Sequence, residues 1–219
     1  MKIDFVSDVS CPWCAIGLNA LEQALARVAP GIQATLHFQP FELNPTMPPE
    51  GQDTVEHLAQ KYGIDAAQIA ANAEAIRQRG ASVGFTFGQG QRRRIYNTFD
   101  AHRLLHWAAL VGAQQQRALK HALFKAYFTD GLSPGDHAVL VQAATDAGLD
   151  SVEAQRILDS DTYAAEVREA EGYYHQQGIS SVPAVIINDR HLISGGQPVE
   201  LFERALRHIA SEGAQEAAA

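Results

Sequence analysis

SDVSCPWCAIG, residues 7–17, holds both cysteines of this 219-residue chain, separated by two residues. The residues before it, Lys2–Val6, alternate polar and apolar side chains, which is typical of a short, half-buried strand. After it, apolar residues recur at helical spacing as far as Val28, and Pro12 suits the first helical position, where no amide hydrogen is needed. The two cysteines therefore lie at a strand-to-helix junction. Such a pair can be a redox centre, half of a metal site, or two neighbouring buried thiols.

Composition and charge narrow the class of protein. The chain is 46% hydrophobic and 19% charged, with a formal net charge of −8, which is ordinary for a globular protein. The negative charge disfavours nucleic acid and anionic membrane as partners. No apolar run approaches the roughly 20 residues that cross a bilayer, and the first residues lack the apolar region of a signal peptide. We therefore expect a cytoplasmic protein, in which a structural disulfide would be unusual.

The order of predicted elements indicates an α/β fold with a helical insertion. The chain begins as strand, helix and strand, the second strand lying over Ile32–Phe41. From Asp53 to about Ser160 the spacing predicts helices almost throughout, except for a Gly-rich loop over Gly84–Tyr96. Two strands follow, over Val182–Asn188 and over 191–194, joined by a turn at Asn188-Asp189, and a last helix covers 198–210. The segment between the second and third predicted strands is far longer than the dozen or so residues that a parallel crossover needs. We therefore expect it to have a structure of its own.

The position of Cys11 favours redox chemistry over metal binding. At a helix start, backbone N–H groups and the helix dipole stabilise a thiolate, and the pKa of a cysteine in this motif falls from about 8.5 to about 3.5–7.5. Cys14 lies one turn later, where it can attack a mixed disulfide on Cys11 and release the product. Zinc would need two further ligands, and no other cysteine exists. His102 and His106 have suitable spacing, but we interpret them as the polar edge of a packed helix.

A second motif, SSVPAVIIN at residues 180–188, places Pro183 at the start of a core-like strand, where a proline needs a special reason. A cis Val182–Pro183 bond is one such reason. It would turn the Val182 backbone outward, to pair with an extended substrate beside Cys11. The alternative is an ordinary trans proline that opens an edge strand.

These motifs resemble those of the DsbA-like thioredoxin-fold oxidoreductases, most closely their cytoplasmic FrnE-like branch, which adjoins the 2-hydroxychromene-2-carboxylate isomerases and the kappa-class glutathione transferases. The likeness rests on SDVSCPWC (7–14), YNTFDAHRLLHWA (96–108), SSVPAVIIN (180–188) and ISGGQP (193–198), and so covers nearly the whole chain. It implies an α/β thioredoxin fold with an inserted all-helical domain. The thioredoxin-like domain would comprise residues 1–48 and 160–212, the insertion 49–159, and a disordered tail 213–219.

Matched motif to motif, the resemblance assigns roles to individual residues. Cys11 would be the exposed nucleophile and Cys14 the resolving thiol, while Pro12 and Trp13 would tune the redox potential. Val182 and a cis Pro183 would bind the substrate backbone.

The chain also departs from its relatives at two positions. Trp13 stands where periplasmic DsbA oxidants have histidine, and Phe5 stands where thioredoxins keep a buried acid. Asp8 is then the nearer candidate for proton transfer, although we interpret it first as a helix-entry or loop residue.

The resemblance implies a thiol–disulfide oxidoreductase that acts on protein or small-molecule thiols and disulfides. Glutathione would be a co-substrate, and neither a metal nor an organic cofactor is expected. The alternative is a glutathione-dependent isomerase or transferase for a small aromatic substrate, and a third hypothesis is a chaperone-like binding module whose cysteines are idle. The relatives also allow a homodimer. Arg92, Arg93 and Arg94 are expected to form loop ion pairs or to face the cleft, where one could attract the carboxylates of glutathione.

Overall fold

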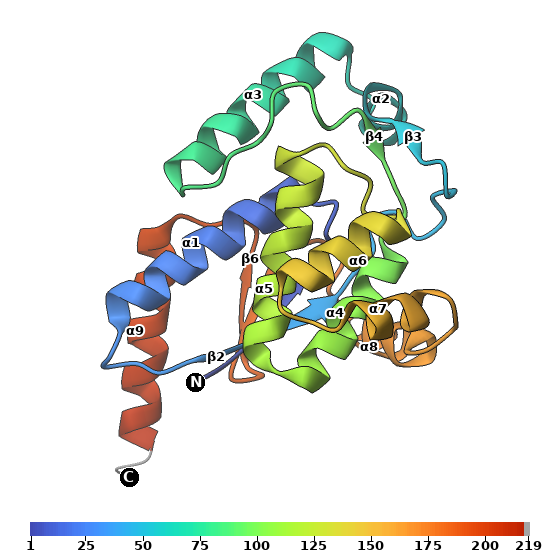
Figure 1. Ribbon diagram of the computed structural model, residues 1–219. Helices are drawn as coiled ribbons and strands as arrows, with labels where there is room; N and C mark the ends of the chain where they lie inside the picture. The colour runs from blue at the N-terminus through green and yellow to red at the C-terminus, as the bar shows by residue number, and fades with distance from the viewer. Residues whose placement is uncertain (217–219) are drawn as a thin grey trace.

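The computed structural model describes residues 1–216, and its centre is a four-stranded mixed sheet with the order β2-β1-β5-β6. β1 (Lys2–Ser7) pairs in parallel with β2 (Thr35–Pro40) and antiparallel with β5 (Ala184–Ile187). β5 pairs antiparallel with β6 (His191–Ser194). Strands from the two ends of the chain therefore lie side by side in one sheet (Figure 1). This is the DsbA-like thioredoxin fold that the sequence predicts.

Between β2 and β5 the chain is mainly helical, as expected. The helices there are α2 (Thr54–Tyr62), α3 (Ala66–Ser82), α4 (Phe99–Val111), α5 (Ala113–Phe124), which continues as a π-helical turn over Lys125–Thr129, α6 (His137–Asp146), α7 (Ser151–Leu158) and α8 (Ala164–Gln176). The expected loop over Gly84–Tyr96 is not entirely irregular. Its end forms β4 (Arg94–Ile95), which pairs with β3 (Gln52–Asp53) because the chain on both sides of α2–α3 returns to the same place.

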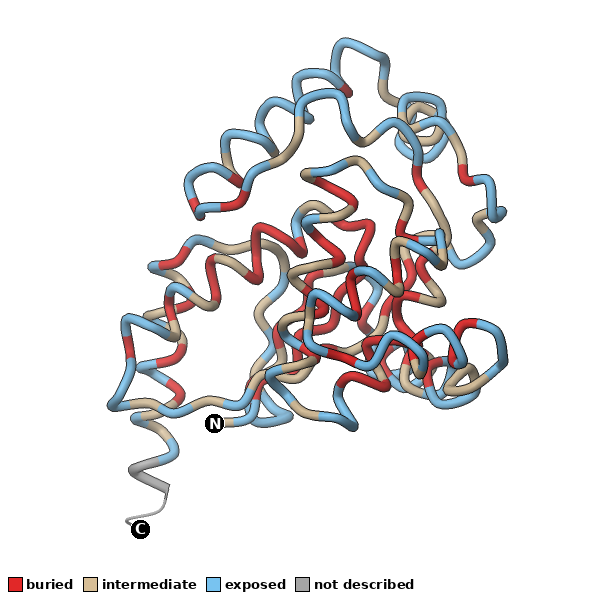
Figure 2. The backbone as a smooth tube through the Cα atoms, viewed as in Figure 1, coloured by how far each residue is buried: buried red, intermediate tan, exposed pale blue. Residues whose placement is uncertain are grey.

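The alternation of side chains along β1 decides what packs on each face of the sheet. Ile3 and Phe5, both fully buried, point into a core shared with α1 (Pro12–Val28) and α9 (Val199–Glu216). Val6 points to the other face, where it packs in a cluster with Tyr174 of α8. Each such side chain contributes roughly 1.5–3 kcal/mol to folding by leaving water. Figure 2 shows that the buried parts of the chain gather around this sheet.

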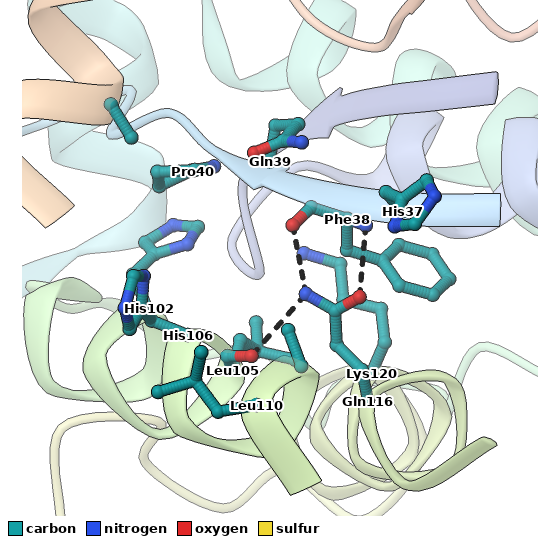
Figure 3. Close-up of a pocket in the computed structure, with 12 residues that line it drawn as sticks. His37, Phe38, Gln39, Pro40, His102, Leu105, His106, Leu110, Gln116 and Lys120 are labelled. Carbon is teal, nitrogen blue, oxygen red and sulfur yellow. Dashed lines mark hydrogen bonds between the residues drawn. The ribbon is translucent and has the colours of Figure 1, made fainter. Parts of the chain in front are cut away.

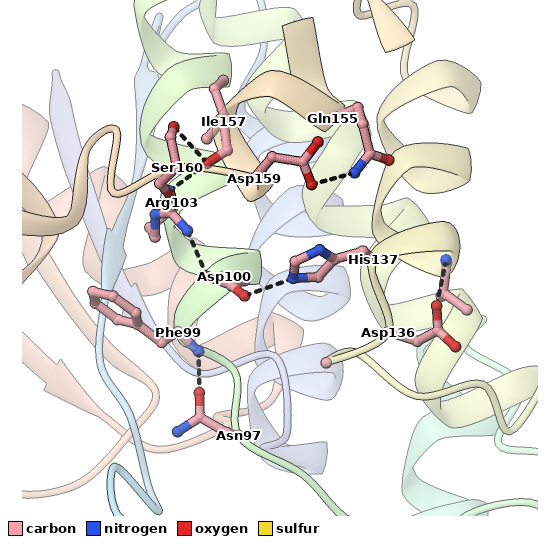
Figure 4. A network of polar contacts seen from close by, with 12 residues as sticks. Asn97, Phe99, Asp100, Arg103, Asp136, His137, Gln155, Ile157, Asp159 and Ser160 are labelled. Carbon is pink, nitrogen blue, oxygen red and sulfur yellow. Dashed lines mark hydrogen bonds and ion pairs between the residues drawn. The ribbon is translucent and has the colours of Figure 1, made fainter. Parts of the chain in front are cut away.

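A buried arginine ties the helices of the insertion together. Arg103 of α4 is 4% exposed and donates to the backbone carbonyls of Ile157 and Ser160 at the end of α7, and to that of Thr162 at 2.9 Å. Carbonyls at a helix end lack intrahelical hydrogen-bond donors, and the guanidinium of Arg103 provides donors for them. It also pairs with Asp100 at 2.7 Å, and Asp100 contacts His137 of α6 at 3.1 Å (Figure 4).

α2 and α3 form the least buried part of the fold (Figure 2). α2 has no buried residue, and in α3 only Ile69 and Gly80 are buried. Both helices begin at an aspartate, Asp53 and Asp65, whose carboxylate accepts backbone N–H bonds of the first turn, a cap worth about 1 kcal/mol. The two helices are therefore held by their own caps and by limited contact with the rest of the molecule.

Two predictions near the C-terminal end have different outcomes. The turn at Asn188-Asp189 is confirmed: both residues have positive φ (53° and 56°) and join β5 to β6. The disordered tail over 213–219 is wrong in its first part, because α9 continues to Glu216; residues 217–219 lie outside the described residues. Within residues 1–216 no helix has the length and apolar character that crossing a lipid bilayer requires.

Two glycines let the first turn of α1 approach the segments beside β5 and β6 closely. A Cβ at Gly17 would lie 3.1 Å from Cγ of Pro183, and a Cβ at Gly196 would lie 2.9 Å from the backbone oxygen of Trp13. A contact of 2.9 Å with rigid backbone leaves no room for a methyl group.

Gly196→Ala is therefore expected to lower the free energy of unfolding by about 1–3 kcal/mol, as overpacking does. The measurement is urea unfolding, with Gly172→Ala as the control. Gly172 lies inside α8 with no atom within 4 Å of the added Cβ, so alanine there should be neutral or stabilising. Equal effects of the two substitutions would contradict the packing argument.

Candidate active site

The strand–helix junction presents Cys11 at the first turn of α1. Cys11 is the N-cap residue, in an extended conformation (φ −90°, ψ 113°), and Pro12 opens the helix. The carbonyl of Cys11 accepts the N–H of Cys14 at 3.1 Å. The backbone N–H groups of Trp13 and Cys14 act on the Cys11 sulfur. Both cysteines are free thiols, so the structure represents the reduced dithiol.

The two thiols have opposite proton affinities. The pKa of Cys11 is lowered, first by the thiol of Cys14 as a hydrogen-bond donor and then by backbone N–H groups, against burial and the charge of Asp8. The pKa of Cys14 is raised well above its ordinary value by burial and by the neighbouring Cys11. Of the two thiols, Cys11 is therefore the one that loses its proton first, and Cys14 is its proton-bearing neighbour.

The segment around Val182 and Pro183 covers the Cys11 sulfur. The Val182–Pro183 bond is cis, and Cys11 Sγ lies 3.5 Å from the Val182 carbonyl oxygen. Cys11 is only 3% exposed, so the expectation of an exposed nucleophile is wrong. The sulfur is shielded because Val182 packs over it.

Cys11 nevertheless lines a groove of about 1010 Å³. One wall comes from the first turn of α1 and from Val182, and the other from α2 and α3. Trp13, 42% exposed, stands at this groove. The part of Trp13 that lowers the pKa of Cys11 is its backbone N–H, which any residue except proline would supply.

Of the three consecutive arginines, Arg92 faces the groove. Its guanidinium donates to the carbonyl of Ser10 at 3.2 Å and to the hydroxyl of Tyr127 at 3.1 Å, and it lies over the rings of Tyr127 and Phe128. Arg94 instead donates to backbone carbonyls at 2.8 and 2.9 Å. The expectation that an arginine faces the cleft thus applies to Arg92.

Asp8 is a buried structural anchor, not a simple loop residue. Its carboxylate accepts from the backbone N–H and hydroxyl of Ser10, the N–H of Leu43 at 2.6 Å and the hydroxyl of Thr98 at 2.8 Å. Burial raises the pKa of Asp8, but the contacts with His102 and these backbone donors outweigh it and hold the pKa at about 2. Asp8 is therefore a permanent negative charge that joins β1 to the insertion.

The interpretation of His102 and His106 as a polar helix edge is wrong for His102. His102 is 2% exposed, and its Nε2 lies 3.7 Å from Asp8, an ion-pair distance too long for a hydrogen bond. His106 is half-buried against the ring of Tyr163. In the described part of the chain, histidine, cysteine, aspartate and glutamate side chains form no group of three that could hold a metal ion.

Lys120 is a further buried polar residue that the sequence reading did not single out. It is fully buried, and its Nζ has no hydrogen-bond partner. A signal was available: Lys120 lies four residues after Gln116 and four before Phe124, and all three belong to the buried face of α5. A lysine on the apolar face of a helix is rare enough to indicate a special role.

Comparison with known proteins agrees with this architecture. Residues 2–207 match the family description "DSBA-like thioredoxin domain". The crystal structure of the probable DsbA oxidoreductase SCO1869 from Streptomyces coelicolor is 33% identical, with a TM-score of 0.90 over 97% of this chain and 91% of that one.

Two more distant solved structures share the fold. A 2-hydroxychromene-2-carboxylate isomerase is 15% identical, with a TM-score of 0.71 over 98% of each chain. The cytosolic disulfide reductase DsbM from Pseudomonas aeruginosa, solved with GSH, is 16% identical, with a TM-score of 0.64 over 96% of this chain and 100% of that one.

Replacing Cys14 tests the origin of the lowered Cys11 pKa. In Cys14→Ala the main donor to the Cys11 sulfur is lost, so the pKa of Cys11 should rise toward the ordinary value of a thiol. Cys14→Ser keeps a hydroxyl donor and should shift it less. The rate of iodoacetamide alkylation against pH gives both values. Identical profiles for the alanine and serine variants would show that the thiol does not stabilise the thiolate.

Asp8 predicts a dependence of stability on pH. Its pKa falls from an ordinary 3.8 to about 2 on folding, so its contribution is complete above about pH 4 and is lost as the pH falls toward 2. At about 1.4 kcal/mol per pKa unit, this contribution is about 2 kcal/mol. Urea unfolding should show that the stability difference between wild type and Asp8→Asn shrinks by that amount from pH 6 to pH 2. A constant difference would refute the assignment.

Proposed function

The chain belongs to the DsbA-like thioredoxin-domain family, and we propose that it is a thiol–disulfide oxidoreductase acting through Cys11 and Cys14. The proposal rests chiefly on one observation. The thiol with the lowered pKa, Cys11, is the one that lines the groove, and the thiol with the raised pKa, Cys14, is completely buried behind it. The thiolate is the nucleophile in disulfide exchange, so this arrangement supports the proposal that Cys11 makes the first attack.

In the reducing direction, the Cys11 thiolate attacks a substrate disulfide. A bond forms between Cys11 Sγ and one substrate sulfur, and the second substrate sulfur leaves as a thiolate that takes a proton. Cys14 then loses its proton and attacks Cys11 Sγ, which forms the Cys11–Cys14 disulfide and releases the first substrate sulfur. The substrate disulfide gains two electrons and the enzyme dithiol loses two. An external thiol such as glutathione restores the dithiol.

The groove beside Cys11 suits an extended peptide or glutathione. The carbonyl of Val182, at the Cys11 sulfur, is a backbone acceptor for an extended substrate, and Pro183 packs behind it against Gly17. Arg92 and Lys61 line the groove and can attract carboxylates. The likeness to DsbM, which was solved with GSH, supports glutathione as the thiol partner.

Reduction is the proposed direction because the cytoplasm is the proposed compartment. The cytosolic glutathione pool is reducing, and it would keep Cys11 and Cys14 as the dithiol found in this structure. Pro12 and Trp13 lie between the cysteines at the groove and are proposed to tune the redox potential.

The direct test is insulin reduction driven by dithiothreitol, with wild type, Cys11→Ser and Cys14→Ser. Wild type should accelerate the reduction, and both variants should fall to the rate in buffer. Cys14→Ser should also retain one glutathione per chain, visible by mass, after exposure to oxidised glutathione, because its mixed disulfide cannot be resolved.

Other outcomes would support the other hypotheses. A wild type that is inactive on insulin but converts an aromatic substrate with glutathione would indicate the isomerase or transferase activity. Suppression of aggregation that neither substitution affects would indicate a chaperone-like binding module.

A further inference from the structure

The second step of the proposed exchange requires a proton acceptor for Cys14. Cys14 is fully buried, and burial together with the neighbouring Cys11 raises its pKa. A thiol in this state does not become a nucleophile until a base takes its proton. Cys11 cannot be this base, because its sulfur is bound to the substrate in the mixed disulfide.

Of the buried groups around the cysteines, Lys120 is the one best suited to accept the proton of Cys14. It rises from α5 toward β2 (Figure 3), is fully buried and has no hydrogen-bond partner for its Nζ. The ammonium form of Lys120 lowers the pKa of Cys14, and the thiolate form of Cys14 is the strongest of the charges that raise the pKa of Lys120. Burial lowers the pKa of Lys120 to about 8, so the amine can change its protonation state near neutral pH.

Two other polar groups near the cysteines fit the role less well. The carboxylate of Asp8 already accepts four hydrogen bonds and has a pKa of about 2, which makes it a weak base. His102 faces Asp8 at 3.7 Å. Its charge is not among the main influences on the pKa of Cys14, which come from burial, Cys11, Lys120 and the backbone at Asp8.

The charge of Lys120 is also coupled to the state of Cys11. In the reduced enzyme the Cys11 thiolate and Asp8 both raise the pKa of Lys120 and favour the ammonium form. When Cys11 enters a mixed disulfide its negative charge disappears, so the pKa of Lys120 falls further and the neutral amine becomes favoured. The base therefore becomes available at the step that needs it.

A cavity lined in part by polar side chains gives this amine a route to solvent. Lys120 lines a cavity of about 190 Å³ together with His37, His102, His106 and Gln116 (Figure 3). The cavity also borders Leu110, which is 65% exposed, so it reaches the surface. It is large and polar enough to hold water, through which the ammonium can return its proton to solvent.

We propose that Lys120 is the proton acceptor that activates Cys14 for resolution of the mixed disulfide. This inference rests on the proposed dithiol function. Because Lys120 Nζ has no hydrogen-bond partner, the neutral amine takes the proton of the Cys14 thiol through one intervening water. The Cys14 thiolate then forms the bond to Cys11 Sγ, the substrate sulfur leaves with the electron pair of the broken bond, and the ammonium loses its proton through the cavity.

The experiment uses a stoichiometric amount of 5,5′-dithiobis(2-nitrobenzoic acid) in a stopped-flow instrument. Attack by Cys11 releases one coloured thionitrobenzoate, and resolution by Cys14 releases the second, so the two phases report the two steps separately. In Lys120→Met the second phase should slow by about 100-fold or more, as expected for loss of a general base. The first phase should change by less than about threefold.

The pH profile distinguishes a proton acceptor from a structural residue. In wild type the rate of the second phase should rise with pH and level off by about pH 8, as the amine loses its proton. In Lys120→Met it should continue to rise, because Cys14 must ionise at its own raised pKa. An unchanged rate and profile in Lys120→Met would overturn the proposal.

Two further variants serve as controls. Lys120→Arg keeps the positive charge but cannot lose a proton, so it should be as slow as Lys120→Met. Recovery of the wild-type rate in Lys120→Arg would mean that charge alone is needed, which would overturn the proposal. Lys125→Met, at an exposed position, should behave like wild type. A wild type that releases only one thionitrobenzoate would refute the dithiol function itself, and with it the role of Lys120.

Fold stability does not confound this test. Lys120→Met replaces a buried amine, which has no hydrogen-bond partner and lies over the ring of Phe124, by an apolar chain of similar length. Such a replacement is neutral or stabilising in most proteins. Urea unfolding should therefore show a variant at least as stable as wild type. A variant that is both stable and slow in the second phase supports the proposal, and equal slowing of both phases contradicts it.

Discussion

The site depends on favouring a negative charge at Cys11 over one at Cys14, in a place that water barely reaches. Burial alone opposes a thiolate, and the structure offsets this with the thiol of Cys14 and the N–H groups of the first turn of α1. Asp8, equally buried and permanently charged, works against the thiolate. The balance of these contributions lowers the pKa of Cys11 and raises that of Cys14.

The helical insertion contributes more than a wall of the groove. His102 lies in α4, and Thr98 lies just before the start of that helix. Both contact the carboxylate of Asp8, close to the cysteines. α5 supplies Lys120, whose charge acts on Cys14. The thioredoxin-like part thus carries the sulfur atoms, while the insertion contributes buried polar and charged groups to their surroundings. α2 and α3 carry little of the core and mainly shape the approach to Cys11.

Much of the fold and the centre of the site could be predicted from the sequence because local signals decide them. Pro12 and the apolar spacing after it define α1, and the spacing of Cys11 and Cys14 defines the dithiol. The buried polar residues that surround the two cysteines could not be predicted in the same way. Asp8, His102 and Lys120 come from three different elements, and the partners of a polar residue far away in the chain leave no periodic pattern. The burial of Cys11 was missed for the same reason, since Val182 covers it from 171 residues away.

The order of the strands has a consequence for biosynthesis. β1 is the second strand of the sheet and needs β5 on its other side, although β5 is synthesised last but one among the strands. Chains emerge from the ribosome N-terminus first, at about 5–20 residues per second. The cysteines therefore appear before Lys120 and well before Val182. A nascent chain therefore carries the dithiol without its buried surroundings until Lys120, and then Val182, have been synthesised.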